Sequence, residues 1–81
     1  MRVKILFFAT LRDRAGTKLT EIELPDQITI KELKQRVAQE FPGLEPSMPN
    51  VLVAVNREYA FDDAVLPEGA EVAMFPPVSG G

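Results

Sequence analysis

Apolar and polar residues alternate in two runs near the start of the chain, and a period of two predicts half-buried β-strands. The first run, VKILFFA over residues 3–9, places Val3, Ile5 and Phe7 on one face and a lysine on the other. The second run, LTEIELP over residues 19–25, sets apolar positions against two glutamates and ends at a proline. Because only a short polar segment joins them, the two strands are predicted to form a hairpin.

The spacing of apolar residues then changes to three and four, which predicts an amphipathic helix. Thr29 is placed to cap its first turn, and Glu32, three residues later, completes a capping box. The helix positions predicted to face the core are Ile30, Leu33, Val37 and Phe41. The positions predicted to face solvent are Lys31, Lys34, Gln35, Arg36 and Glu40.

The second half of the chain holds shorter elements. Residues 44–50 contain two prolines and are predicted to form an irregular connection. Residues 51–56 are predicted to form a strand that turns tightly at an Asn-Arg pair into a brief return over residues 58–60. A last strand is predicted over residues 71–75.

The order strand, strand, helix, strand, short strand, strand is satisfied by one main helix on one face of a mixed sheet. This α+β architecture is the β-grasp, or ubiquitin-like, arrangement, with four to five strands and with the first and last strands adjacent at the sheet centre. We therefore expect a β-grasp domain over residues 1–75. Residues 76–81 are expected to form a flexible, extended C-terminal tail that ends in diglycine.

The amino-acid composition excludes the catalytic and metal-binding chemistry that needs cysteine or histidine. The 81 residues include no cysteine and no histidine, which excludes a thiol nucleophile, a disulfide and an imidazole base or ligand. A net charge of −3 disfavours nucleic-acid binding, and the apolar runs are too short to span a membrane. The carboxylates available to steer a basic partner are Glu58, Asp62, Asp63, Glu68 and Glu71. Nothing in their spacing fixes a metal geometry, so we expect neither a metal nor a bound cofactor.

The tail PPVSGG is suited to enter another protein. Pro76 and Pro77 favour an extended backbone and cannot continue a sheet ladder. Six extended residues reach about 20 Å, and Gly80 and Gly81 carry no side chain that would block a narrow channel. The carboxylate of Gly81 is then the expected chemical centre. ATP would convert it to an acyl-adenylate, which sulfide, persulfide, thiol or amine could attack.

Three stretches of the chain resemble the small subunits of molybdopterin synthase, the sulfur carriers of the ubiquitin-like superfamily. They are VKILFFATLRDRAG near the start, VNREY in the middle and LPEGAEVAMFPPVSGG at the end, so the resemblance runs essentially from one end of the chain to the other. Diglycine is shared with many ubiquitin-like proteins. The discriminating feature is Pro76, Pro77 and Val78 immediately ahead of Ser79.

The resemblance implies a cycle with two partners. An adenylating enzyme uses ATP and magnesium to activate Gly81, and a sulfur donor converts the adenylate to a thiocarboxylate. The tail residues Pro76, Pro77, Val78, Ser79 and Gly80 then thread into the large synthase subunit, where sulfur passes to a pterin precursor and forms a dithiolene. The carrier would be a non-catalytic, cytoplasmic subunit of a heterotetramer of two small and two large subunits.

Exposed aromatic residues are predicted to form the docking patch for such partners. Phe8 and Phe75 each share a strand face with a charged residue, and Tyr59 follows the predicted tight turn. If the predicted alternation is shifted by one residue, the two faces of each strand are exchanged and these rings would instead lie in the core. Arg12 either pairs with an acidic group of a partner or guides the tail, or it is a solvated charge or pairs with Asp13 or a nearby carboxylate.

Other functions share the first activation step. A sulfur carrier for thiamin synthesis or tRNA thiolation would end in the same diglycine, and a protein modifier would pass its activated terminus to a lysine of its target. An interaction module with an inert tail would do neither. The acceptor of the activated carboxylate is what separates these possibilities.

Overall fold

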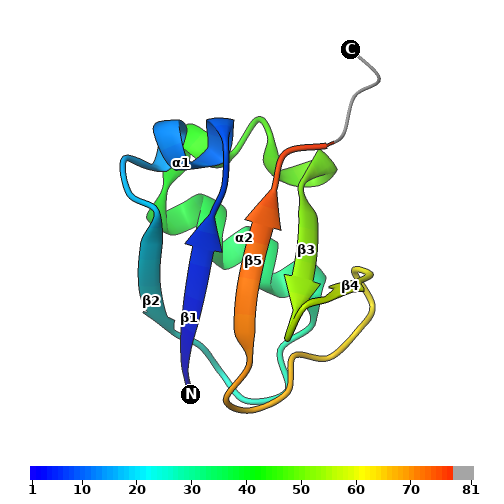
Figure 1. Cartoon of the computed structure of the whole chain (residues 1–81). Helices are drawn as coiled ribbons and strands as arrows, with labels where there is room; N and C mark the ends of the chain where they lie inside the picture. Colours follow the sequence, from blue (N-terminus) through cyan, green and yellow to red (C-terminus); the bar gives the residue numbers. More distant parts are fainter. Residues whose placement is uncertain (78–81) are drawn as a thin grey trace.

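The structure of the chain is a computed structural model that describes residues 1–77 (Figure 1). Within these residues five strands, two α-helices and two turns of 3-10 helix follow one another. In chain order they are β1 (Arg2–Phe7), α1 (Thr10–Ala15), β2 (Leu19–Glu23), α2 (Ile30–Glu40), η1 (Pro42–Leu44), η2 (Met48–Asn50), β3 (Leu52–Val55), β4 (Glu58–Ala60) and β5 (Glu71–Phe75). The predicted tail residues Val78, Ser79, Gly80 and Gly81 lie outside the described residues.

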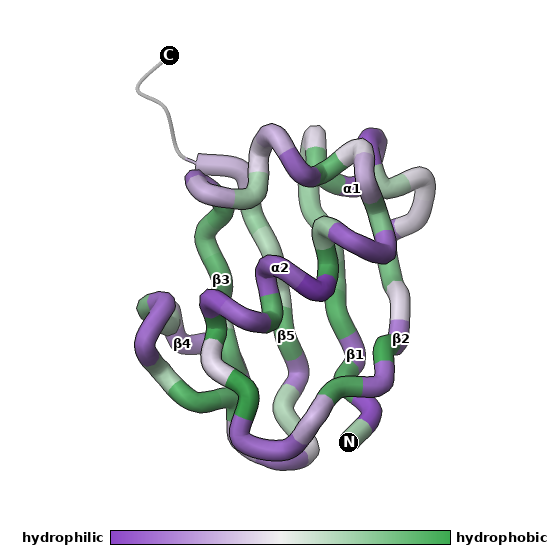
Figure 2. Tube along the Cα trace, turned by 180° about the vertical axis from the view of Figure 1, so that it is seen from behind, coloured by the Kyte–Doolittle hydropathy of each residue, from purple (hydrophilic) through white to green (hydrophobic). Residues whose placement is uncertain are grey.

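The strands form one mixed sheet in the order β2-β1-β5-β3-β4. The first and last strands, β1 and β5, are parallel neighbours at its centre, and the other pairs are antiparallel. Figures 1 and 2 show α2 crossing one face of the sheet and leaving the other face free of helix. The β-grasp prediction is confirmed, with five strands and one main helix.

The inner face of the sheet and the stripe on α2 together form the core. The alternation in β1 buries Val3, Ile5 and Phe7, and that in β5 buries Val72 and Met74. Three of the four predicted helix positions are also fully covered: Ile30, Leu33 and Val37. The fourth, Phe41, is partly buried just beyond the helix, where its ring meets Phe7 edge to face at 5.3 Å.

The predicted capping box fixes the start of α2. The Thr29 hydroxyl accepts a hydrogen bond from the Glu32 backbone N–H at 3.2 Å. In return, the Glu32 carboxylate accepts from the Thr29 backbone N–H and hydroxyl, each at 2.9 Å. The bond from the Thr29 N–H, followed by that from its hydroxyl, holds the pKa of Glu32 below its ordinary value.

The capping box makes a testable contribution to stability. We expect Thr29→Ala to lower the free energy of unfolding by about 1 kcal/mol at neutral pH. Because the pKa of Glu32 is lowered by folding, its contribution is present above the unfolded pKa and is lost as pH falls through the folded pKa. Urea denaturation at neutral and acid pH should therefore show that Glu32→Gln destabilises at neutral pH and makes little difference in acid.

Glu40 supplies the matched control for this prediction. It is an exposed glutamate in the last turn of the same helix and takes no part in the capping box. Glu40→Gln should leave stability unchanged or raise it slightly, because a negative charge is unfavourable at a helix C-terminus. An equal loss in both glutamine variants would show that the capping box does not stabilise α2.

The connection predicted to be irregular contains more structure than the sequence indicates. The turns η1 and η2 lie within or beside residues 44–50, and they bury Leu44 and Met48. A Cβ on Gly43 would lie 3.1 Å from the Arg14 carbonyl oxygen, and the Arg14 guanidinium donates to the Ser47 hydroxyl. This connection therefore packs directly against α1 and supports the end of the sheet from which β5 leaves.

The predicted tight turn between β3 and β4 is confirmed. Asn56 and Arg57 have φ values of 50° and 72°, and two positive values are typical of a two-residue hairpin. The Asn56 side chain also accepts a hydrogen bond from the Glu71 backbone N–H at 3.0 Å, which ties the turn to β5. No helix in the described part of the chain is long and apolar enough to cross a membrane.

Candidate functional site

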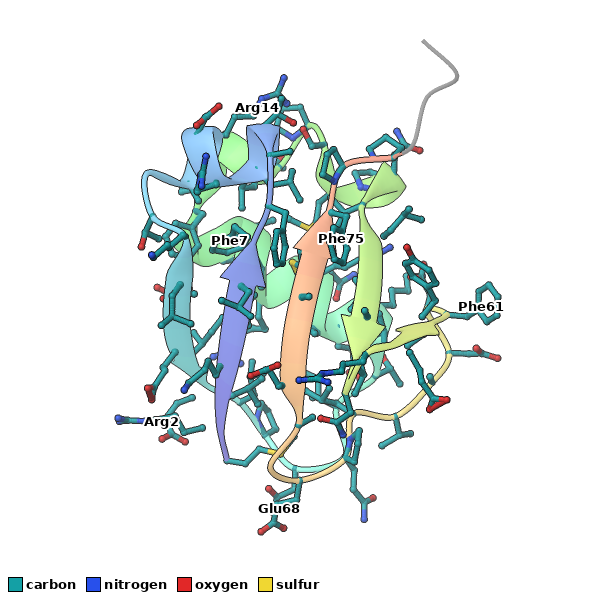
Figure 3. The ribbon with its side chains drawn as sticks, in the orientation of Figure 1. Arg2, Phe7, Arg14, Phe61, Glu68 and Phe75 are labelled. Atoms are coloured by element: carbon teal, nitrogen blue, oxygen red, sulfur yellow. The ribbon has the colours of Figure 1, made fainter. Side chains whose placement is uncertain are left out.

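The sheet face opposite α2 carries a pair of aromatic rings at the ends of the two central strands, β1 and β5. Parallel pairing of β1 with β5 continues one step past the strand, because the Phe8 N–H donates to the Met74 carbonyl at 3.1 Å. Phe8 is therefore held beside Phe75, and the two rings stack at a centroid distance of 4.6 Å with 12° between their planes. Figure 3 shows Phe75 on the side of β5 that α2 does not cover.

The rings stand over a shallow hollow of about 360 Å³. Ala54 and Ala73 are directly paired between β3 and β5. Because both side chains are small, they form the floor of the hollow. We call the surface around this hollow the docking face, formed by Leu6, Phe8, Ala54, Tyr59, Ala73 and Phe75. Arg57 and Glu71 add opposite charges to its lining.

The predicted grouping of three aromatic residues on one surface is confirmed. Phe8 is 40% exposed and Tyr59 is 70% exposed, while Phe75 is half-buried by its neighbours. Tyr59 pairs with Ala54 across the β3–β4 hairpin and therefore shares its face. The alternative in which these rings belong to the core is excluded. Their role in partner binding stays a prediction.

The docking face lies close to the point where the tail begins. β5 ends at Phe75, and it is followed by the half-buried Pro76 and the exposed Pro77. The other four tail residues, including Gly81, lie outside the described residues. A partner that covered Phe75 would thus also cover the start of the tail.

Arg12 lies on α1, exposed, at the same end of the sheet (Figure 1). Within residues 1–77 it forms no ion pair, so the predicted pairing with Asp13 or a nearby carboxylate is not seen, and the finding fits the alternative of a solvated charge. Its role as a partner contact stays a prediction.

The carboxylates predicted to steer a partner do not gather in one place. Glu68 lies in the loop at the end of the sheet opposite the tail (Figure 3). Asp62 is paired with Lys34 at 3.0 Å, and the Lys34 side chain is only 13% exposed. The prediction that Lys34 faces solvent is therefore wrong, because the loop after β4 folds over this part of α2. In the residues described, no group of three or more carboxylates is arranged to hold a metal ion.

The chemical character of the docking face follows from the residues that line it. The sequence has no cysteine or histidine, and the docking face offers apolar surface with one arginine and one glutamate at its rim. An exposed apolar surface of this kind is suited to binding another protein.

Comparison with known proteins agrees with this interpretation. A family model described as the ThiS family matches residues 5–81. The "Molybdopterin synthase sulfur carrier subunit" of Escherichia coli (strain K12) is 38% identical over 81 residues, which cover 98% of this chain and 99% of the relative.

Two solved structures share the fold over their whole length. SAMP1 from Haloferax volcanii superimposes with a TM-score of 0.88 at 26% identity, and the match covers 100% of both chains. A chain from the complex of subunits 1 and 2 of molybdopterin-converting factor from Helicobacter pylori 26695 gives a TM-score of 0.67 at 26% identity, again over 100% of both chains.

Proposed function

The chain belongs to the ThiS family, and on that premise we propose that it is the sulfur carrier subunit of a molybdopterin synthase. The observation that supports this function most directly is the stacked Phe8–Phe75 pair, which places an apolar docking face at the foot of the tail. A carrier needs a rigid platform for partners and an end that reaches their active sites. It does not need a catalytic side chain of its own.

The proposed chemistry takes place at the carboxylate of Gly81. A carboxylate oxygen attacks the α-phosphorus of ATP, pyrophosphate leaves, and an acyl-adenylate forms. Sulfide then attacks the acyl carbon, the carbon–oxygen bond to AMP breaks, and a thiocarboxylate remains. ATP and magnesium belong to the adenylating enzyme in this scheme, and the carrier itself holds no cofactor.

The loaded tail then delivers sulfur in the large synthase subunit. Pro76, Pro77, Val78, Ser79 and Gly80 thread the channel of that subunit, and Phe8, Tyr59, Phe75 and Arg12 contact its surface. A dithiolene contains two sulfur atoms, so two loaded carriers are consumed for each product. The Helicobacter pylori structure, a complex of subunits 1 and 2, supports a large-subunit partner. We further propose a heterotetramer of two small and two large subunits in the cytoplasm.

A second candidate function is covalent modification of proteins. It is favoured by the structural likeness to SAMP1, which is a small archaeal modifier protein. In that case a lysine amine of the target attacks the acyl-adenylate, AMP leaves, and an isopeptide bond forms. Sulfur carriers for thiamin synthesis or tRNA thiolation remain a third possibility within the same family.

Intact-mass spectrometry tests the proposal. The chain is incubated with the cognate adenylating enzyme, ATP, magnesium and sulfide, and we expect a mass gain equal to replacement of one oxygen by one sulfur. Addition of the purified large subunit and the pterin precursor should then return the carrier to its original mass and yield the dithiolene. Lysine-linked adducts without a thiocarboxylate would favour the modifier function instead. Absence of any sulfur-loaded form would contradict the carrier function.

A further inference from the structure

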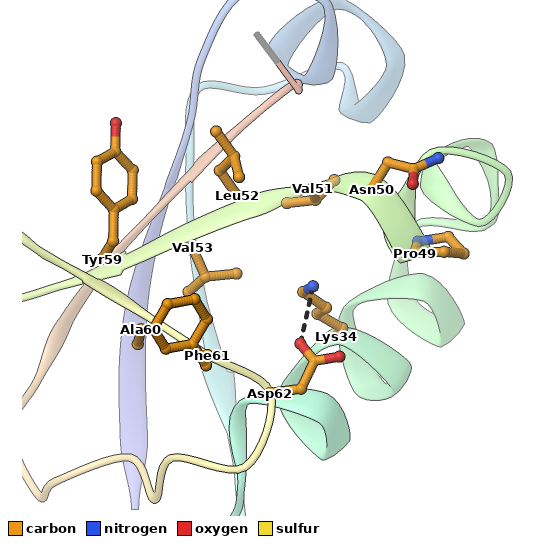
Figure 4. Close-up of a pocket in the computed structure, with 10 residues that line it drawn as sticks. All are labelled: Lys34, Pro49, Asn50, Val51, Leu52, Val53, Tyr59, Ala60, Phe61 and Asp62. Carbon is orange, nitrogen blue, oxygen red and sulfur yellow. Dashed lines mark ion pairs between the residues drawn. The ribbon is translucent and has the colours of Figure 1, made fainter.

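A second apolar hollow lies around the edge of the sheet from the docking face. It is a groove of about 700 Å³ lined by η2, β3, β4, the start of the loop that follows β4, and α2 (Figure 4). We call it the edge groove, and the residues that define it here are Lys34, Val53, Tyr59, Ala60, Phe61 and Asp62. Its volume lies in the range of small-molecule pockets, so it has ample room for a large side chain.

The edge groove carries an aromatic ring that is exposed to solvent. Phe61 is 81% exposed, the largest exposure among the large apolar residues that the structure describes. Figure 3 shows its ring directed away from the body of the protein. The floor beneath is apolar, since Val53 is 2% exposed and Ala60 is partly buried against the core. Exposed apolar surface of this kind, bordered by polar residues, marks a site of protein interaction.

The charges around the groove favour a basic occupant. Lys34 is the single cation among the lining residues, and its ammonium is already paired with Asp62. Figure 4 shows this pair at the wall of the groove that α2 provides. The neighbouring carboxylates of Glu58 and Asp63 are exposed and form no ion pair with any residue that the structure describes. The rim therefore carries uncompensated negative charge.

The groove is continuous with the docking face. Tyr59 lines both the hollow of the docking face and the edge groove, so no other surface separates them. β4 is the last strand of the sheet, and within residues 1–77 no strand lies along its outer edge. An extended peptide segment can pair with such an edge while alternate side chains enter a neighbouring groove.

We propose that the partner seated on the docking face extends a segment around β4 and places a large apolar side chain of that segment in the edge groove. Lysine or arginine residues of the same segment face Glu58 and Asp63. The identity of the partner rests on the proposed function, under which it is the large synthase subunit. The groove would then add specificity beyond the docking face, because a partner without the basic segment would contact the docking face alone and bind more weakly.

Substitution at Phe61 tests the proposal. Because this side chain is almost fully exposed, Phe61→Ser should leave the melting temperature near that of the wild type. We expect its affinity for the purified large subunit, measured by titration calorimetry, to fall about tenfold or more. Phe61→Leu, which keeps an apolar side chain, should recover much of the affinity. Val65→Ser is the matched control, since Val65 is 55% exposed in the same loop and does not line the groove.

The charge component has its own measurement. The double variant Glu58→Lys/Asp63→Lys should bind the large subunit more weakly and with a smaller dependence on salt concentration than the wild type. Wild-type binding with no change in Phe61→Ser would overturn this inference while the proposed function stands. If the wild-type chain fails to bind the large subunit at all, the proposed function fails and the inference fails with it.

Discussion

Deletion of Gly81 is expected to abolish dithiolene formation without changing the stability of the folded domain. The shortened chain still ends in a carboxylate, but that group lies about 3.3–3.6 Å closer to the body of the protein. A displacement of about 1 Å from a reacting centre can cost a hundredfold in rate, so a whole residue should remove all measurable turnover. Adenylation, thiocarboxylate formation and product formation are each measured with purified partners.

Stability and binding supply the controls for the deletion. The core cluster of the described region extends no further than Met74, so the melting temperature should be that of the wild type. The affinity for the large subunit should also persist in part, because the docking face is intact. Val65→Ser lies outside both the tail and the docking face, and it should retain turnover. A Gly81-deleted chain that still supports product formation near the wild-type rate would contradict the assignment of Gly81 as the chemical centre.

Replacement of Phe75 by alanine is expected to weaken binding of the large subunit about thirtyfold or more, the loss of about 2 kcal/mol that marks a hot spot. Phe75 stacks on Phe8 at 4.6 Å, and the two rings rise above a floor of small residues. Truncation removes one ring and leaves the other without its neighbour. Titration calorimetry gives the affinity, and urea denaturation shows how much of the effect comes from lost stability.

A double-mutant cycle separates the pair from its surroundings. Because the rings are in contact, the losses in Phe8→Ala and Phe75→Ala should not add in the double variant. Val65→Ala, an exposed apolar residue outside the docking face, should bind as tightly as the wild type. An unchanged affinity in Phe75→Ala would show that partners use another surface.

Much of the fold follows from local patterns that a sequence displays. The period of two in β1 and β5 decides which residues face the core, and it correctly places Phe8 and Phe75 on the outer side. The capping box at Thr29 and Glu32 marks the start of α2 to the residue. These features are predictable because each depends on residues no more than a few positions apart.

The features that escaped prediction depend on contacts between distant segments or on single turns. The helical pattern predicts that Lys34 faces solvent, yet Asp62, from a loop far along the chain, pairs with it and the side chain is largely buried. The turns η1 and η2 are each three residues long, too short to produce a period. The edge groove has no sequence signal either, because β3, β4 and α2 contribute to it only after folding. The one available signal in the sequence was a phenylalanine, Phe61, directly followed by two aspartates.

The parallel pairing of β1 with β5 also constrains how the protein is made. Residues of β1 such as Lys4 pair with residues of β5 such as Glu71, so the centre of the sheet joins nearly opposite ends of the described chain. Contacts of such long sequence separation form late and slow the folding of a domain. During synthesis on the ribosome, the edge of β1 that pairs with β5 remains unpaired until β5 has been synthesised. A chain that stops before β5 therefore lacks the centre of its sheet, and the cell's proteases can remove it before it competes for partners.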